Sequence, residues 1–157
     1  YIPMTSPSQT AFPPVSQDRI ASTLTAMDVK FYREGNGEVR TAFPGLVVFF
    51  EVENQGFKAT SRWMAVLDQP ADVETLRELA NSLNRSLPLV RVHPVQREDG
   101  TAIAIVEAPF FSGDGFADQQ LREMCEYFFS AIHHVAGKLR EAFPGREESF
   151  TDTAKEA

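Results

Sequence analysis

The chain has 157 residues, a formal net charge of −7 and a hydrophobic content of 43%, which together suit one globular domain with a substantial core. The acidic balance, with no cluster of lysine and arginine, disfavours a nucleic-acid partner, and no apolar run is long enough to predict a membrane span. The single cysteine excludes an intrachain disulfide and suits a reducing, cytoplasmic location.

Residues 1–14 carry several prolines among serine, threonine and glutamine. That composition predicts a flexible, extended N-terminal arm. A helix is predicted to follow, because Ser16 is a good N-cap, Asp18 falls in the first turn, and the apolar spacing continues to about Asp28.

Alternating apolar and polar residues then replace the helical spacing. Short turns that contain glycine or asparagine separate the alternating stretches, a pattern typical of an antiparallel meander. Four strand-like segments result: Val29–Arg33, Val39–Thr41, Leu46–Glu53 and Phe57–Val66.

A second helix is predicted to begin at Pro70, since proline is favoured in the first turn, and to close at Pro88. A hairpin follows, with strands Leu89–Val95 and Thr101–Val106 joined through a turn. Pro94 lies inside the first of these strands, so that end is expected at a sheet edge or a bulge.

The longest predicted element is a helix over Asp118–Phe143, with Asp118 as a candidate N-cap. Its apolar residues recur at intervals of three and four and form one broad stripe, roughly 39 Å long at 1.5 Å per residue. Residues 145–157 are acidic overall and are expected to be a disordered tail. Residues 15–144 are therefore predicted to form one α+β domain: a single antiparallel sheet with three helices, in the order α-β-β-β(-β)-α-β-β-α.

This order resembles the YbjN-like family of bacterial proteins, labelled sensory-transduction regulators, whose fold is like that of type III secretion chaperones. The resemblance runs from about Val15 to Pro144 and implies that chaperone-like fold. It is carried by these stretches: Ser16 through Leu24, Gly56 through the pair Arg62-Trp63, Leu79 through Asn84, Gly115 through Gln120-Leu121, and Ala142-Phe143-Pro144. At Leu83 the chain departs from the aromatic residue that usually precedes the asparagine.

No constellation of residues predicts a catalytic, cofactor or metal site. His133 and His134 are neighbours on the last helix and diverge by about 100°, so they cannot converge on one metal. Cys125 falls within the apolar stripe beside acidic residues, which suits an inert buried thiol. Gly113-Asp114-Gly115 precedes a helix, but no lysine or hydroxyl residue follows in P-loop register. We therefore expect no cofactor and no metal.

The connection over residues 108–116 is unusual because it carries Phe110, Phe111 and Phe116, whereas most connections are polar. These rings either cap the end of the core or form an exposed apolar patch for a partner. Tyr127, on the polar side of the last helix, favours the second alternative. Trp63 is more often a core residue than a binding platform, and it completes the set of candidate partner-binding residues.

Two functions remain open from these observations. The first is a non-enzymatic protein-binding or adaptor domain that holds an unidentified protein partner. The second is a small-molecule-binding protein or enzyme whose site forms only in three dimensions, around Asp114, His133 and Arg62. A shallow apolar groove would favour the first, and a deep pocket lined by those three residues the second. A twofold homodimer is also expected, from the sheet edges and the phenylalanine-rich connection.

Overall fold

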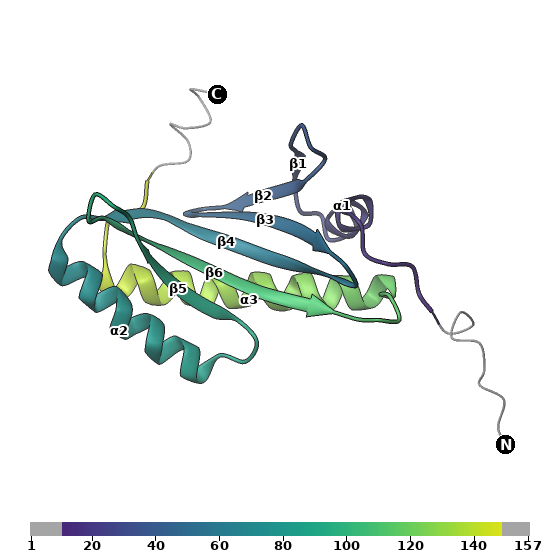
Figure 1. Ribbon diagram of the computed structural model, residues 1–157. Helices are drawn as coiled ribbons and strands as arrows, with labels where there is room; N and C mark the ends of the chain where they lie inside the picture. The colour runs from purple at the N-terminus through teal and green to yellow at the C-terminus, as the bar shows by residue number, and fades with distance from the viewer. Residues whose placement is uncertain (1–10, 149–157) are drawn as a thin grey trace, which may run out of the picture.

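The computed structural model describes residues 11–148 as one antiparallel sheet of six strands with three helices (Figure 1). This is the predicted α+β class and the predicted order of elements. The elements, in chain order, are α1 (Gln17–Ala26), β1 (Tyr32–Arg33), β2 (Val39–Phe43), β3 (Leu46–Glu53), β4 (Gly56–Leu67), α2 (Pro70–Ser86), β5 (Arg91–Gln96), β6 (Ala102–Phe111) and α3 (Asp118–Ala142).

The strands follow the order β1-β2-β3-β4-β6-β5 across the sheet. Consecutive strands from β1 to β4 pair as the predicted meander, and β6 inserts beside β4, which leaves β5 at an edge. Pro94 lies in this edge strand, as predicted. Proline has no backbone N–H to donate, so an edge strand, which needs ladder bonds on one side only, tolerates it.

Both sheet edges are protected. On β5, the Asn84 amide of α2 takes the place of a neighbouring strand: its oxygen accepts from Val92 N at 2.7 Å and its nitrogen donates to Val92 O at 3.0 Å. The other edge is β1, which has only two residues. Short or covered edges resist pairing with another chain. A partner is therefore expected to bind to a face of the domain rather than to a strand edge.

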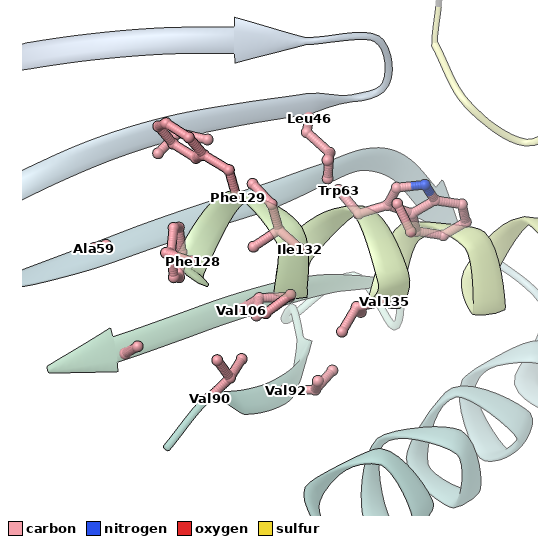
Figure 2. Packing of buried hydrophobic residues seen from close by; sticks show 14 of the residues in the cluster. Leu46, Ala59, Trp63, Val90, Val92, Val106, Phe128, Phe129, Ile132 and Val135 are labelled. Atoms are coloured by element: carbon pink, nitrogen blue, oxygen red, sulfur yellow. The ribbon is translucent and has the colours of Figure 1, made fainter. Parts of the chain in front are cut away.

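The core lies between one face of the sheet and the helices. Alternation along the strands sends Phe57, Ala59, Ser61 and Trp63 of β4 into this core together with the even-numbered residues of β6. The apolar stripe of α3 lies across β4 and β6, and Figure 2 shows Phe128, Ile132 and Val135 directed at the strands. α2 covers β5 on the same side (Figure 1), and α1 packs against α3 and β2. Within residues 11–148, no helix lies on the opposite face of the sheet.

The ends of several elements differ from the sequence predictions. The first strand is only Tyr32–Arg33 rather than Val29–Arg33. The last helix is capped at Ala117 rather than at Asp118, and the Ala117 N–H donates to the Gln120 side chain at 2.7 Å. Asp118 instead pairs with Arg19 of α1 at 2.9 Å, so a tertiary contact replaces the expected cap.

The largest difference concerns β6, which runs to Phe111 and absorbs the first half of the predicted connection. The β4–β6 ladder continues to the pairs Phe57–Phe110 and Gly56–Phe111. The strand pairs with β5 only up to Glu107, so Pro109 has a strand neighbour on one side alone. Proline is tolerated at such a position.

The described parts of the two flanking segments form hydrogen bonds with the domain. Phe12 N donates to Asp114 O at 2.7 Å, and Phe116 N donates to Pro13 O at 3.0 Å. Likewise Glu148 N donates to Met64 O at 2.7 Å. Residues 1–10 and 149–157, the rest of the predicted arm and tail, lie outside the described residues.

No helix among residues 11–148 combines the length and the apolar character needed to cross a bilayer.

Candidate functional site

Asp114, His133 and Arg62, the residues around which an enzyme site was considered, do not converge. Asp114 lies in the loop before α3, and His133 lies on α3 itself, about 22 Å along the axis from the first turn at 1.5 Å per residue. Arg62 projects from the sheet face opposite α3, because its neighbours Ser61 and Trp63 face the core. One pocket therefore cannot hold all three.

The histidines have local partners. His133 Nδ1 lies 2.6 Å from Phe129 O, and its ring packs edge-on against Phe43 with centroids 4.7 Å apart. His93 Nε2, on the other side of the sheet, lies 3.0 Å from a Glu107 carboxylate oxygen. Within residues 11–148, histidine, cysteine, aspartate and glutamate form no group of three or more that is placed to hold a metal ion.

Cys125 is buried within the stripe of α3. Burial, with a smaller contribution from Glu126, raises the pKa of its thiol to about 12. At pH 8 this leaves roughly a thousandfold less thiolate than a pKa of 9.0 would give. Only the thiolate is a nucleophile, so the cysteine suits a structural role rather than catalysis.

We expect Cys125 to react with a thiol reagent at least about 100-fold more slowly in the folded protein than in 8 M urea at pH 8, since both burial and the raised pKa suppress thiolate attack. Stopped-flow absorbance with an aromatic disulfide reagent measures both rates. The Cys125→Ala, Ser130→Cys variant is the matched control, because Ser130 lies on the exposed side of the same helix; it should react rapidly when folded. Equal native and unfolded rates for Cys125 would contradict its burial.

The three phenylalanines near the end of β6 divide between core and surface. Phe110 and Phe116 are buried and pack around Phe57, with ring centroids 5.1 and 5.9 Å from it. Phe111 is 59% exposed. Strand alternation explains the division of Phe110 and Phe111, because neighbouring residues of β6 face opposite sides of the sheet. Of the two alternatives left open by the sequence, the core cap describes Phe110 and Phe116, and the exposed apolar side chain describes Phe111.

Trp63, also a candidate surface residue, is 1% exposed. Its ring lies 6.1 Å from that of Phe143 at the end of α3, and Figure 2 shows it among the core side chains beside α3. Trp63 and Phe116 therefore offer no surface to a partner in this conformation.

Phe110 and Tyr127, by contrast, meet at one groove. The groove has a volume of about 530 Å³ and lies between α3, the end of β6 and the turn that follows α2. We call it the α3–β6 groove. It is lined by Pro88, Leu89, Phe110, Gln120, Glu123, Met124 and Tyr127.

The turn that forms one wall of the groove is held in place from α3. The Tyr127 hydroxyl donates to Pro88 O, and Val90 N donates to the same carbonyl oxygen at 2.7 Å. Leu89 adopts a positive φ of 69° and is 45% exposed. The bond between Val90 and Pro88 makes this a three-residue γ-turn centred on Leu89, and a positive φ is uncommon for a residue with a bulky side chain. This backbone conformation directs the Leu89 side chain toward solvent at the rim of the groove. There it could contact an apolar side chain of a bound partner.

The polar side chains of the groove are already engaged by their own helix. The Gln120 oxygen accepts from Ala117 N, and a Glu123 oxygen accepts from the Gln119 amide at 3.2 Å. The surface left for an occupant is therefore mainly apolar: the Leu89 side chain, the ring of Tyr127, the edge of Phe110 and the flexible thioether of Met124. A methionine adapts its shape to different apolar partners.

Of the seven groove residues, the sequence analysis names Phe110 and Tyr127 as candidates and misses the other five, among them the apolar Leu89 and Met124. The sequence pattern places Leu89 in a predicted strand and Met124 in the last helix. The one signal for Leu89 in the sequence is that an apolar residue directly follows Pro88. That pattern fits the start of a strand as well as it fits a turn. Its contact with α3 depends on where the chain turns after α2, which residue spacing does not reveal.

The uncovered side of the sheet forms a second surface, which we call the open face. It holds the side chains that alternate with the core residues of β2, β3, β4, β6 and β5. Its charged pairs include Lys58 with Glu51 at 3.4 Å, Lys58 with Glu107 at 3.8 Å and Arg40 with Glu38 at 3.3 Å. Glu51 accordingly raises the pKa of Lys58. Around these pairs lie half-buried apolar side chains: Val47, Phe49, Met64, Val66, Ile103 and Ile105.

Comparison with known proteins identifies a family that shares this sequence pattern and two solved structures that share this fold. The YbjN family model, described as "Putative bacterial sensory transduction regulator", matches residues 16–141. No curated protein matches the chain in sequence.

Two solved structures share the fold. One is the crystal structure of YbjN, "a putative transcription regulator from E. coli", with a TM-score of 0.64 at 13% identity, covering 80% of this chain and 94% of that one. The other is an uncharacterized protein from Methanothermobacter thermautotrophicus, with a TM-score of 0.51 at 15% identity, covering 82% of this chain and 99% of that one. At such identities the similarity shows the fold alone.

Proposed function

The chain belongs to the YbjN family of bacterial proteins, and we propose that it acts as a non-enzymatic regulatory or adaptor domain that binds a segment of a protein partner in the α3–β6 groove. The family description names a regulator of sensory transduction. A regulator of that kind changes the behaviour of another molecule by binding to it.

The observation that carries this proposal is the apolar groove itself. It brings Leu89 and Tyr127, both exposed, together with Phe110 and Met124 from separate elements. Aromatic and methionine side chains are enriched in protein interfaces, and tyrosine is a frequent hot-spot residue. The polar side chains of the groove, Gln120 and Glu123, each accept a hydrogen bond from their own helix region, from Ala117 N and from the Gln119 amide.

The shape of the groove favours an amphipathic peptide segment. One wall is the N-terminal half of α3, with Gln120, Met124 and Tyr127 at spacings of four and three along one side of the helix. A helix or extended segment can lie along such a row and place its apolar side chains between Tyr127 and Leu89. This mode needs only contacts that the groove already presents.

The proposal predicts that Leu89→Asp removes partner binding. An aspartate at the rim would place a charge where an apolar side chain of the partner must be buried, and this is costly without a counter-charge. Tagged wild-type and variant proteins would be used to recover partners from a lysate of the source organism, with quantitative mass spectrometry of the bound fraction. We expect the proteins enriched by the wild type to fall at least about tenfold with Leu89→Asp.

The matched control is Val95→Asp, which introduces the same charge at an exposed apolar residue of the edge strand β5, away from the groove. It should retain the wild-type set of partners. Circular dichroism would establish that both variants are folded. Equal recovery by the wild type and Leu89→Asp would refute the groove as the partner site.

We also propose a cytoplasmic location, in keeping with the one buried thiol, and a homodimer. The structure changes the expected interface of such a dimer. Because β1 is short and β5 carries Pro94 and the Asn84 bridge, two copies would associate through a face rather than through strand edges. A twofold arrangement uses the same face on both copies.

A further inference from the structure

The open face contains an arginine, Arg62, whose side chain has no hydrogen-bond or ion-pair partner among residues 11–148. Its Nε is buried without an acceptor. A buried donor without an acceptor loses its bond to water and gains nothing in return, which costs stability. This arrangement is therefore incomplete unless an acceptor comes from elsewhere.

The other cations of the open face are already paired. Lys58 contacts two carboxylates, Arg40 contacts Glu38 and Glu34, and His93 contacts Glu107. Arg91 donates to the carbonyl oxygens of residues 87 and 90. Arg62 thus differs from every other cation on this surface within the described part of the chain.

Apolar side chains surround Arg62 on the open face. In the sheet register its direct neighbours are Val47 of β3 and Ile105 of β6, and Met64 lies two residues further along the same strand, on the same face. All three are half-buried. The guanidinium therefore lies within a band of aliphatic surface, where an ion pair is screened less than in open water.

A second orphaned polar atom lies beside it. Thr60 is two residues before Arg62 on the same face of β4, is only 4% exposed, and its Oγ1 is buried without a hydrogen-bond partner. Unpartnered polar atoms also occur on the core-facing Ser61 and Trp63 of the same strand. Thr60 and Arg62 are the two of these four residues whose side chains lie on the open face, where an outside segment could supply a partner.

We propose that the open face docks a second protein segment, one that carries aliphatic side chains around a single carboxylate, and that this carboxylate pairs with Arg62. Charge complementarity selects the occupant. The fork of a guanidinium matches a carboxylate with two parallel hydrogen bonds, and Val47, Met64 and Ile105 complement aliphatic side chains on either side of it. The face is a sheet surface rather than a cavity, which suits a polypeptide better than a small acid.

The net charge of −7 does not oppose such a contact strongly. At physiological salt, charges further apart than about 8 Å are largely screened. Glu51 and Glu107, two carboxylates of the open face, both pair with Lys58, at 3.4 and 3.8 Å. Neither forms an ion pair with Arg62 within the described residues.

This surface lies on the other side of the sheet from the α3–β6 groove, so a domain with both sites occupied would hold two segments at once. The inference does not depend on the groove. A failure of Leu89→Asp to reduce partner recovery would leave Arg62 and its surroundings unchanged.

Selection from a phage-displayed library of linear 12-residue peptides tests the proposal. The full chain would be immobilised, and synthetic peptides from the enriched sequences would be titrated by calorimetry. We expect enriched peptides to share an aspartate or glutamate flanked by aliphatic residues. Their Kd should rise at least about tenfold with Arg62→Met, which keeps the apolar stem, and equally when the peptide carboxylate is replaced by an amide. Making both changes together should cost no more than either alone.

Arg40→Met is the matched control, since it removes an arginine of the same face that already has carboxylate partners, and binding should stay within about twofold. Enriched peptides without an acidic residue, no enrichment, or binding that is indifferent to both Arg62→Met and the amide peptide would overturn the proposal.

Two further measurements identify other occupants, either of which would also overturn it. Light scattering that shows a dimer of the wild type and a monomer of Arg62→Glu would assign the face to a second copy. A deletion of residues 149–157 that alone accelerates hydrogen exchange at Val47 and Ile105 would assign it to the chain itself.

Discussion

Phe128→Ala is expected to lower the free energy of unfolding by about 3–5 kcal/mol, because it removes a phenyl ring from the centre of the core and leaves a cavity that the sheet and α3 cannot close. Phe128 is fully buried, and Figure 2 shows its ring between α3 and the strands beneath it. A loss of this size is a large fraction of the total stability of a domain of this length.

Urea titration followed by circular dichroism measures this loss, with the m-value used to check that unfolding remains two-state. Glu126→Ala is the control on the exposed side of α3. It removes only the surface pair with Arg122, in which the charged atoms are 2.8 Å apart, and should change stability by no more than about 0.5 kcal/mol. Comparable losses for the two variants would mean that the stripe of α3 is wrongly assigned.

Trp63→Ala should cost a similar amount, about 3–5 kcal/mol, since the largest side chain of the core would be truncated where β4 meets the end of α3. Trp63→Phe should cost much less, about 1.5 kcal/mol or below. The indole Nε1 is buried and has no hydrogen-bond partner in the described structure, so its removal relieves an unmet donor. That gain offsets part of the volume lost.

Chemical denaturation monitored by circular dichroism suits both variants, because tryptophan fluorescence is absent from them. The comparison also tests the two roles that the sequence left open for Trp63. A binding platform would lose partner recovery with little change in stability, whereas a core residue would do the reverse for Trp63→Ala. A free energy of unfolding that is unchanged in Trp63→Ala would refute the core assignment.

Much of the fold followed from local sequence. Ser16 was identified as the first N-cap by residue type alone, and the structure shows its hydroxyl accepting from Arg19 N at 3.1 Å. The strand Leu46–Glu53 was predicted with its observed bounds. Both succeed because capping and strand alternation depend on residues only a few positions apart. Family resemblance through short stretches such as Arg62-Trp63 was also correct.

The candidate sites could be predicted only in part. The sequence names Tyr127 and Phe110 as partner-binding candidates. The turn that joins them into a groove is not predicted, because Pro88 is read as the end of a helix and Leu89 as the start of a strand. The separation of Asp114, His133 and Arg62 was likewise undetermined. Whether polar residues far apart in sequence meet in space depends on strand order and on which face each strand buries.

What the sequence determined by itself is the set and order of elements, since the periods of 2 and 3.6, the caps and the prolines are local properties of the chain. The tertiary structure decided which surfaces remain. Extension of the β4–β6 ladder to Phe111 sent Phe110 inward and Phe111 outward. Placement of all three helices on one side buried Trp63 and left Arg62, its neighbour in sequence, on the uncovered face without a partner in the described structure. These outcomes depend on long-range pairing, in which a shift of one residue would exchange the two faces of a strand.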